Sequence, residues 1–153
     1  MTTVREATDH SAALARAVAD RMFMNDRASR ALGMSIVGVG PGFAELTMTV
    51  RADMLNGHAI CHGGYVFTLS DSAFAFACNS YNFNTVAQGC AIEFLAPAHE
   101  GDVLTARATE RSLAGRTGVY DIEVTNQRGE RIALFRGKSY RIKGHIVEGD
   151  GEG

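Results

Sequence analysis

Residues 65–80, which read YVFTLSDSAFAFACNS, constrain the fold of this chain more than any other stretch. The run is too long for a single strand, and its content of Ala, Phe and Leu favours a buried helix. A helix that is apolar nearly all round has to be covered on most of its sides. A curved antiparallel sheet wrapped around it satisfies this requirement with one core. The expected fold class is therefore α+β.

Strand candidates account for most of the sheet that this helix requires. Two short runs rich in β-branched residues flank Gly40-Pro41-Gly42, which predicts a hairpin over residues 34–50. Successive strands joined by short turns are expected to be antiparallel neighbours. Further strands are predicted at residues 86–94, 103–110, 117–125 and 131–142, with the last two joined by a hairpin at 126–130.

The two ends of the chain are predicted to differ. Near-helical spacing of apolar residues predicts a helix over residues 8–33, capped by Asp9 or Ser11 and stopped at Gly33. Residues 144–153, GHIVEGDGEG, are expected to form a flexible C-terminal tail. A chain of 153 residues without an internal repeat or linker fits a single domain, here residues 1–143.

Composition and charge exclude several classes of protein. A net charge of −2, from 15 basic and 17 acidic residues, gives no footprint for nucleic acid. No apolar run is long enough to span a bilayer, and MTTVREATDH lacks the order of a signal peptide, so a cytoplasmic location is expected. Cys61, Cys78 and Cys90 show no C-x-x-C spacing, so neither a disulfide framework nor a zinc site is expected.

The residues His62-Gly63-Gly64 come directly before the apolar helix. Paired glycines allow close approach to the backbone. The first N–H groups of a helix have no intrahelical partner, and the helix dipole favours negative charge there. A carbonyl oxygen that becomes an oxyanion would be stabilised at this position. The alternative is a plain turn between loop and helix.

Asp71 lies inside the apolar helix, among Phe67, Phe74 and Cys78 on the same face. A carboxylate is costly to bury unless it is paired or has a function. The alternative is an Asp on an exposed strip, or one that is bonded to Thr68 or Ser72. No Lys or Arg occurs between residues 65 and 84, which weakens the case for a local ion pair.

The spacing between these two features predicts a dimer. Asp71 and Gly64 are seven residues apart, which at ~1.5 Å per residue places them about 10 Å apart along the helix axis. Asp71 of one chain cannot easily act on a carbonyl that is held by its own Gly63 or Gly64. Two antiparallel helices from two subunits would bring the groups together, so two sites are expected at the interface of a homodimer.

Three other patterns are weaker. Cys61-His62 suggests a nucleophile pair, but such pairs are usually distant in sequence. His58 and His62 would bind metal only on a helix, and no third ligand is evident, so no metal is expected. Arg136 and Lys138 share one face of the last predicted strand and are candidates for binding phosphate groups. Solvated surface charges are the commoner explanation.

The stretch LNGHAICHGGYVFTLSDSAFAFACNS resembles the phenylacetic-acid-degradation thioesterases (PaaI type) of the hotdog superfamily. The similarity extends to AIEFLAPAHEGDVLTARA, GVYDIEV and IALFRGKSYRI, and it covers roughly residues 8–143. The resemblance implies the hotdog fold, in which an antiparallel sheet wraps a long central helix. Family members hydrolyse acyl-CoA thioesters, often with aryl groups, and their dimers commonly pair into homotetramers.

The resemblance also implies roles for individual residues. Asp71 corresponds to the essential carboxylate, which one subunit supplies. Gly63 corresponds to the donor of a backbone N–H to the thioester oxygen, with Gly64 assisting. Asn56 matches the position that helps to place the nucleophilic water, and His62 the His that shapes the turn or the pocket.

The main hypothesis is hydrolysis of an aryl- or phenylacetyl-CoA-type thioester by a homodimer or homotetramer, without a cofactor or metal. Asp71 acts either as a general base on water or as a direct nucleophile. The second hypothesis is a hotdog enoyl-CoA hydratase or dehydratase with His62 or His58 as the base. The third is a non-catalytic acyl-CoA binding module. Nucleic acid and membranes are not expected partners.

Overall fold

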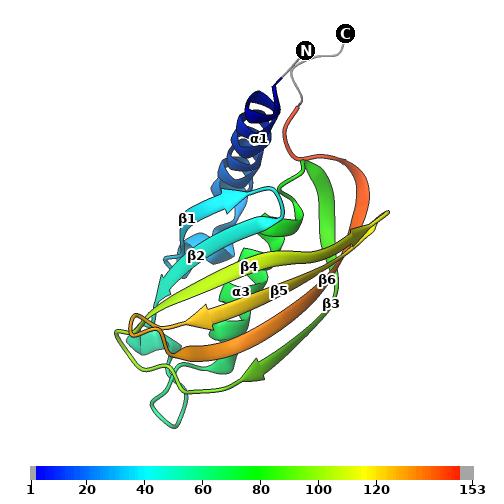
Figure 1. Cartoon of the computed structure of the whole chain (residues 1–153). Coiled ribbons are helices and arrows are strands. Elements are labelled where there is room, and N and C mark those ends of the chain that lie inside the picture. The colour runs from blue at the N-terminus through cyan, green and yellow to red at the C-terminus, as the bar shows by residue number, and fades with distance from the viewer. Residues whose placement is uncertain (1–2, 149–153) are drawn as a thin grey trace.

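A six-stranded antiparallel sheet curves around one central helix, α3, in the computed structural model (Figure 1), which describes residues 3–148. The strands follow the order β1-β2-β4-β5-β6-β3. The prediction of an antiparallel sheet wrapped around an apolar helix is confirmed. The elements are α1 (Val4–Asn25), α2 (Arg27–Ala31), β1 (Ser35–Gly40), β2 (Phe43–Thr49), a short 3-10 helix (Ala52–Met54), α3 (Gly63–Cys78), β3 (Phe83–Phe94), β4 (Val103–Ala114), β5 (Thr117–Thr125) and β6 (Arg131–His145).

Helix α3 begins two residues before the predicted start and ends two before the predicted end. Leu69, Phe74 and Phe76 are each at most 1% exposed and pack in the core beneath the sheet. Burial of each such side chain contributes roughly 1.5–3 kcal/mol. A Cβ atom on Gly137 of β6 would lie 2.7 Å from the Phe74 ring, so glycine is needed there for the helix to approach the strand.

The concave face of the sheet carries the core. Along β5, residues alternate between buried and half-buried, with Tyr120, Ile122 and Val124 turned toward α3. This period of two is the pattern of a strand with one face in the core. The hairpin that follows turns at Asn126, whose Oδ1 accepts the backbone N–H groups of Arg128 and Glu130, both at 3.0 Å.

The predicted helix over residues 8–33 is divided into two helices at Asp26. Helix α1 also begins earlier than expected, because Thr3 and Glu6 form a capping box in place of a cap at Asp9 or Ser11. Asp26 departs from helical geometry (φ −88°, ψ 89°) and caps α2 with its own side chain. Gly33, at φ 70°, follows the end of α2 as predicted.

Strand β3 does not pair with β4, which follows it in the sequence. It pairs instead with β6, from Phe94 opposite Ala133 to Phe83 opposite His145, while β4 pairs with β2. The expectation that successive strands are neighbours is therefore wrong at this step and correct for β4, β5 and β6. As a result β3 lies at the edge of the sheet (Figure 1).

The last strand extends further than predicted. Strand β6 continues to His145, two residues past the expected domain boundary at 143. Asn82 then accepts the backbone N–H groups of Ile146 and Val147 at 3.1 and 2.9 Å. The remainder of the predicted tail, residues 149–153, lies outside the described residues. Across residues 3–148, no helix has the combined length and apolar character needed to cross a membrane.

Candidate active site

The amino end of α3 is organised by His62. This residue is the N-cap, and its Nδ1 accepts the backbone N–H of Gly64 at 2.9 Å. The proton of the neutral imidazole therefore resides on Nε2. The N–H of Gly63 has no acceptor within residues 3–148. Of the two glycines, Gly63 thus offers the open donor for an oxyanion, while the N–H of Gly64 is already bound.

Gly63 also forms part of the wall of a surface hollow. A Cβ atom at this position would come within 2.9 Å of Cζ of Phe94, so the ring of β3 lies directly against the glycine. The hollow has a volume of about 780 Å³. Its wall is mostly apolar beside Gly63, and its other lining residues include Val66, Leu95, Pro97 and Ile132.

Asn56 lies in the same wall, in the loop before α3. Its Oδ1 accepts the backbone N–H groups of His58 and Ile60 at 2.9 and 3.4 Å. These bonds fix the side chain and leave the Nδ2 group without an acceptor among the described residues. An NH₂ group held in this way is able to donate to a water molecule or a ligand.

Asp71 lies half-buried in the middle of α3 and has no hydrogen-bond or ion-pair partner in the part of the chain that the structure describes. The bonds considered to Thr68 and Ser72 are not formed. Thr68 donates to the carbonyl of Gly64 at 2.8 Å, and Ser72 lies 2.7 Å from the hydroxyl of Ser29. Burial raises the pKa of Asp71, and the negative charge of Asp26 raises it further.

The two parts of the predicted site stay apart within one chain. Because α3 is continuous from Gly63 to Cys78, the spacing of about 10 Å between Gly64 and Asp71 holds. Asp71 is not among the residues that line the hollow at Gly63. Cys90 lies on the side of β3 that faces α3, near Asp71. Burial raises the pKa of its thiol, and the negative charge of Asp71 raises it further.

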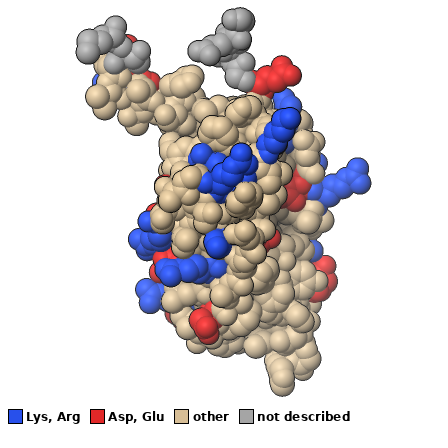
Figure 2. Space-filling view, turned by 90° about the vertical axis from the view of Figure 1, so that its right-hand side faces the viewer, with Lys and Arg blue, Asp and Glu red and all other residues tan. Residues whose placement is uncertain are grey.

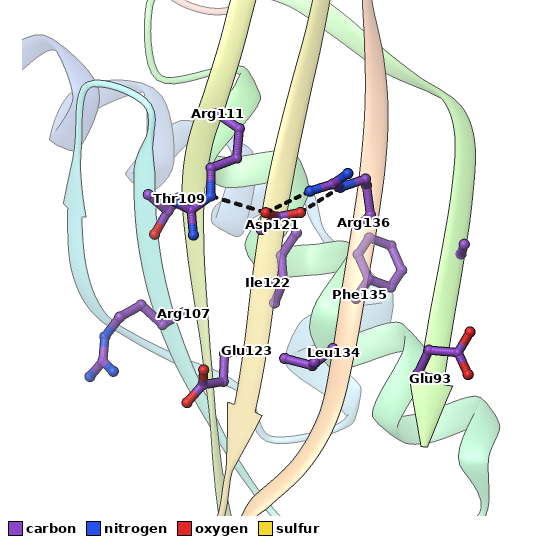
Figure 3. A pocket seen from close by; sticks show the side chains of 11 residues that line it. Glu93, Arg107, Thr109, Arg111, Asp121, Ile122, Glu123, Leu134, Phe135 and Arg136 are labelled. Carbon is purple, nitrogen blue, oxygen red and sulfur yellow. Dashed lines mark hydrogen bonds and ion pairs between the residues drawn. The ribbon is translucent and has the colours of Figure 1, made fainter. Parts of the chain in front are cut away.

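Arg136 and Lys138 share one face of β6 as predicted, but this is the convex face of the sheet, away from α3. Arg136 makes two bonds to Asp121, at 2.7 and 2.9 Å, and Arg111 binds the same carboxylate at 3.0 Å (Figure 3). Arg136, more than Arg111, lowers the pKa of Asp121. A phosphate group would therefore compete with Asp121 for Arg136.

The weaker candidates find other roles. Burial raises the pKa of the Cys61 thiol to about 11, which makes it a poor nucleophile at neutral pH, and the His62 ring is engaged as a cap. His58 lies in a loop before the helix. Within residues 3–148, no three His, Cys, Asp or Glu side chains gather as a metal site.

Two neighbours of the site were not predicted from the sequence. Asp26 acts on Asp71 across 45 residues of sequence, and Cys90 approaches it from β3. Phe94 lines the hollow and lies against Gly63, a contact that no sequence pattern indicated. An Asp is a residue type that commonly caps a helix, so the sequence offers a reason for Asp26 at the break between α1 and α2. No sequence pattern, however, connects Asp26 to α3.

An antiparallel sheet curved around a long central helix is the hotdog fold, and within residues 3–148 this helix has an open N–H at its start and an unpaired acid in its middle. The family model "Thioesterase superfamily" matches residues 58–133, which span both features. This chain belongs to the thioesterase superfamily.

Individual relatives agree with this assignment. The chain is 54% identical over 129 residues to the acyl-coenzyme A thioesterase PaaI of Escherichia coli K12, covering 84% of this chain and 92% of the relative. A structure of the E. coli PaaI protein from the phenylacetic acid degradation operon matches with a TM-score of 0.87 at 51% identity, over 88% of this chain and 97% of that one. A Streptococcus mutans UA159 protein bound to acetyl CoA matches with a TM-score of 0.71 at 27% identity, over 73% and 90% of the two chains.

Proposed function

We propose that the protein hydrolyses acyl-CoA thioesters, with aryl or phenylacetyl-type acyl groups, to the free acid and CoA. The observation that carries this proposal is Asp71, a half-buried acid with no partner among the described residues, two turns into a helix whose first N–H is open. The E. coli relative is named as an acyl-CoA thioesterase, and its structure is assigned to a phenylacetic acid degradation operon, which supports the substrate class. We further propose that the reaction takes place in the cytoplasm and belongs to the catabolism of phenylacetate or related aromatic acids.

In the proposed reaction the Gly63 N–H and the dipole of α3 polarise the thioester carbonyl. Asp71 takes a proton from water, whose oxygen attacks the carbonyl carbon to form a tetrahedral oxyanion. The C–S bond then breaks, and the departing thiolate recovers the proton from Asp71. The raised pKa of Asp71 makes it a stronger base than an ordinary carboxylate. The Nδ2 group of Asn56 is available to hold the water.

Direct attack by Asp71 on the carbonyl carbon is the alternative route. It would expel the CoA thiolate and leave a mixed anhydride, which water then hydrolyses. Single turnover in water enriched in oxygen-18 detects an anhydride that water opens at its Asp71 carbonyl, because only that step puts label into the Asp71 carboxylate. Label enters the product acid if Asp71 acts as a base, and also if water opens the anhydride at its acyl carbonyl.

The active unit is proposed to be a homodimer formed along β3. This strand is 12 residues long, its edge beyond β6 is open, and most of its residues are exposed. Val86 and Phe94 are 45% and 56% exposed on it. Figure 2, which views the side of the molecule where β3 lies, shows a broad band without charged residues. A long open edge of this kind is normally paired or protected, and pairing with a second β3 would bring Asp71 toward the partner's helix start.

Two finer parts of the proposal concern assembly and the nucleotide end of CoA. Dimers are proposed to pair further into a homotetramer, and sedimentation measures which species forms. Arg136 and Lys138 are proposed to contact CoA phosphates, with Lys138 exposed and Arg136 shared with Asp121. If so, Lys138→Ala raises KM for acyl-CoA without a change in kcat, whereas an unchanged KM removes Lys138 from the site.

The test is a screen of phenylacetyl-, hydroxyphenylacetyl-, benzoyl- and medium-chain acyl-CoA for release of free thiol. Thiol release with a preference for the aromatic substrates is expected. Loss or gain of enoyl absorbance without thiol release would instead indicate a hydratase or dehydratase. Tight binding of several acyl-CoA types without turnover would indicate a binding module. The engagement of the His62 ring as a cap favours hydrolysis over a His-based hydratase.

A further inference from the structure

A chain of hydrogen bonds, half-buried at Asp26 and buried between Ser29 and Ser72, connects α3 to the junction of α1 and α2. Asp26 lies at this junction, and its Oδ1 accepts the backbone N–H of Ser29 at 2.9 Å. Its Oδ2 accepts the Ser29 hydroxyl at 2.6 Å. The Ser29 hydroxyl lies 2.7 Å from that of Ser72, the residue that follows Asp71 on α3. Ser29 and Ser72 are 1% and 8% exposed, so water has little access to the link between them.

The protons in this chain point in one direction. An ionised carboxylate accepts hydrogen bonds and donates none, so Ser29 donates its proton to Asp26. The Ser29 oxygen then accepts the proton of Ser72. Ser72 thereby directs its hydroxyl to a different element, whereas Thr68 and Ser70 donate to carbonyl groups one turn earlier in α3 itself. The bond therefore connects α3 to α2 at the residue that follows Asp71.

We propose that Asp26 is a positioning residue for Asp71: through Ser29 and Ser72 it holds the orientation of α3, and it places a second negative charge near the candidate catalytic carboxylate. The inference rests on the proposed function, in which Asp71 is the base. Asp26 also has a local role, because its side chain caps α2. The link to α3 is additional to that role.

Asp26 is the charged group that acts on Asp71 within residues 3–148. After burial, its charge is the remaining cause that raises the pKa of Asp71. The other titratable side chains near Asp71 are thiols, Cys78 on α3 and Cys90 on β3. Like charges disfavour ionisation, so the charge of Asp26 strengthens Asp71 as a base.

Other charges on the inner side of the sheet are engaged elsewhere. Glu110 of β4 accepts the hydroxyl groups of Tyr81 and Tyr120, both at 2.9 Å. Arg141 of β6 lies over the ring of Phe83, 4.4 Å from its centroid. The remaining residues that β2, β4 and β5 turn toward α3 are buried and uncharged: Ala44, Leu46, Met48, Leu104, Ala106, Ala108, Ile122 and Val124.

The test compares Asp26→Asn with the wild type in the pH profile of kcat/KM. Asn retains an oxygen that accepts the Ser29 N–H, and it removes the charge. With the charge gone the pKa of Asp71 falls, so the acid limb of the profile moves to lower pH and the rate on the plateau drops. Ser72→Ala is the matched variant: it breaks the link but keeps the charge, so kcat falls at every pH while the limb stays in place.

Two further measurements keep the result decisive. Asp26→Ser also retains an N-cap without a charge, and it replaces Asp26→Asn if that variant does not fold. Carbon-13 NMR titration of the Asp71 carboxyl group needs no turnover, so it tests the inference even if the proposed function fails. A lower pKa of Asp71 in Asp26→Asn or Asp26→Ser than in the wild type supports the inference. An unchanged Asp71 titration, or an unchanged kcat in Ser72→Ala, would overturn it.

Discussion

The start and the middle of helix α3 hold the two groups of the proposed site, and these groups are built in opposite ways. At the start, three consecutive residues form the donor: the His62 ring accepts the N–H of Gly64 and leaves the N–H of Gly63 open. In the middle, elements from distant parts of the chain bury Asp71, and none of the described residues pairs with its carboxylate. A backbone donor is thus prepared locally, whereas the reactivity of a carboxylate is prepared by its burial.

The separation of the two groups along the helix is the reason for proposing that two protomers form each site. Both groups belong to one rigid helix, and about 10 Å along the axis separates Gly64 from Asp71. No side-chain rotation closes that distance. In the proposed dimer each helix offers a donor to one substrate and an acid to another, and the open edge of β3 is where a second copy would complete each site.

The largest expected effect comes from removing the acid alone. Asp71→Asn keeps the size of the side chain and the helix start intact, so substrate still binds, but general-base catalysis is lost. A fall in kcat of roughly 10²–10⁴-fold is expected in the thiol-release assay. Size-exclusion chromatography and circular dichroism should show an unchanged fold and assembly. Asp20→Asn, at an exposed acid on α1, is the control, and near-normal turnover in Asp71→Asn would remove Asp71 from the mechanism.

Disturbing the helix start is expected to have the next largest effect. In Gly63→Ala the new methyl group meets the Phe94 ring, at 2.9 Å before any adjustment, so the ring shifts and the N–H is displaced from the carbonyl. We expect kcat/KM to fall roughly tenfold or more, in line with the loss of an oxyanion donor. Gly57→Ala is a matched control in the same wall, because a Cβ there meets nothing within 4 Å. If Gly63→Ala and Gly57→Ala behave alike, the contact with Phe94 has no catalytic role.

Mixed dimers test the separation of the two groups directly. Gly63→Val and Asp71→Asn are each expected to be inactive as pure proteins. When the two are unfolded and refolded together, half of the dimers are mixed, and each mixed dimer has one intact site, so about a quarter of wild-type activity should return. Recovery is measured against each variant refolded alone. No recovery would mean that the two groups act within a single chain.

The smallest effect concerns stability. The pKa of Asp71 is raised in the folded state, so between the unfolded and folded values the folded protein binds more protons. The contribution of Asp71 to stability is therefore lost as pH rises through this window. The free energy of unfolding in urea of Asp71→Asn, relative to that of the wild type, should therefore increase from acidic to neutral pH. Glu100→Gln, at an exposed acid, is the control. The opposite trend would mean that Asp71 has a stabilising partner.

The sequence alone determined the local features of this protein. The length and the Ala, Phe and Leu content of residues 65–80 predicted α3, and runs rich in β-branched residues between turn residues predicted the six strands. The motif His62-Gly63-Gly64 and the isolated Asp71 indicated both groups of the proposed site, since paired glycines and a carboxylate in an apolar helix each call for an explanation. The spacing of the two along one helix then predicted a second subunit.

The tertiary structure alone decided which distant residues meet. Strand β3 pairs with β6 rather than β4, which sets Phe94 against Gly63 and leaves an open edge. Arg136 is held by Asp121 on the convex face, and Asp26 is connected to the residue beside Asp71. Sequence patterns indicate whether a residue faces the core but not which residue it contacts there. The contact depends on the spatial order of the strands in the sheet and on how the helices pack against it.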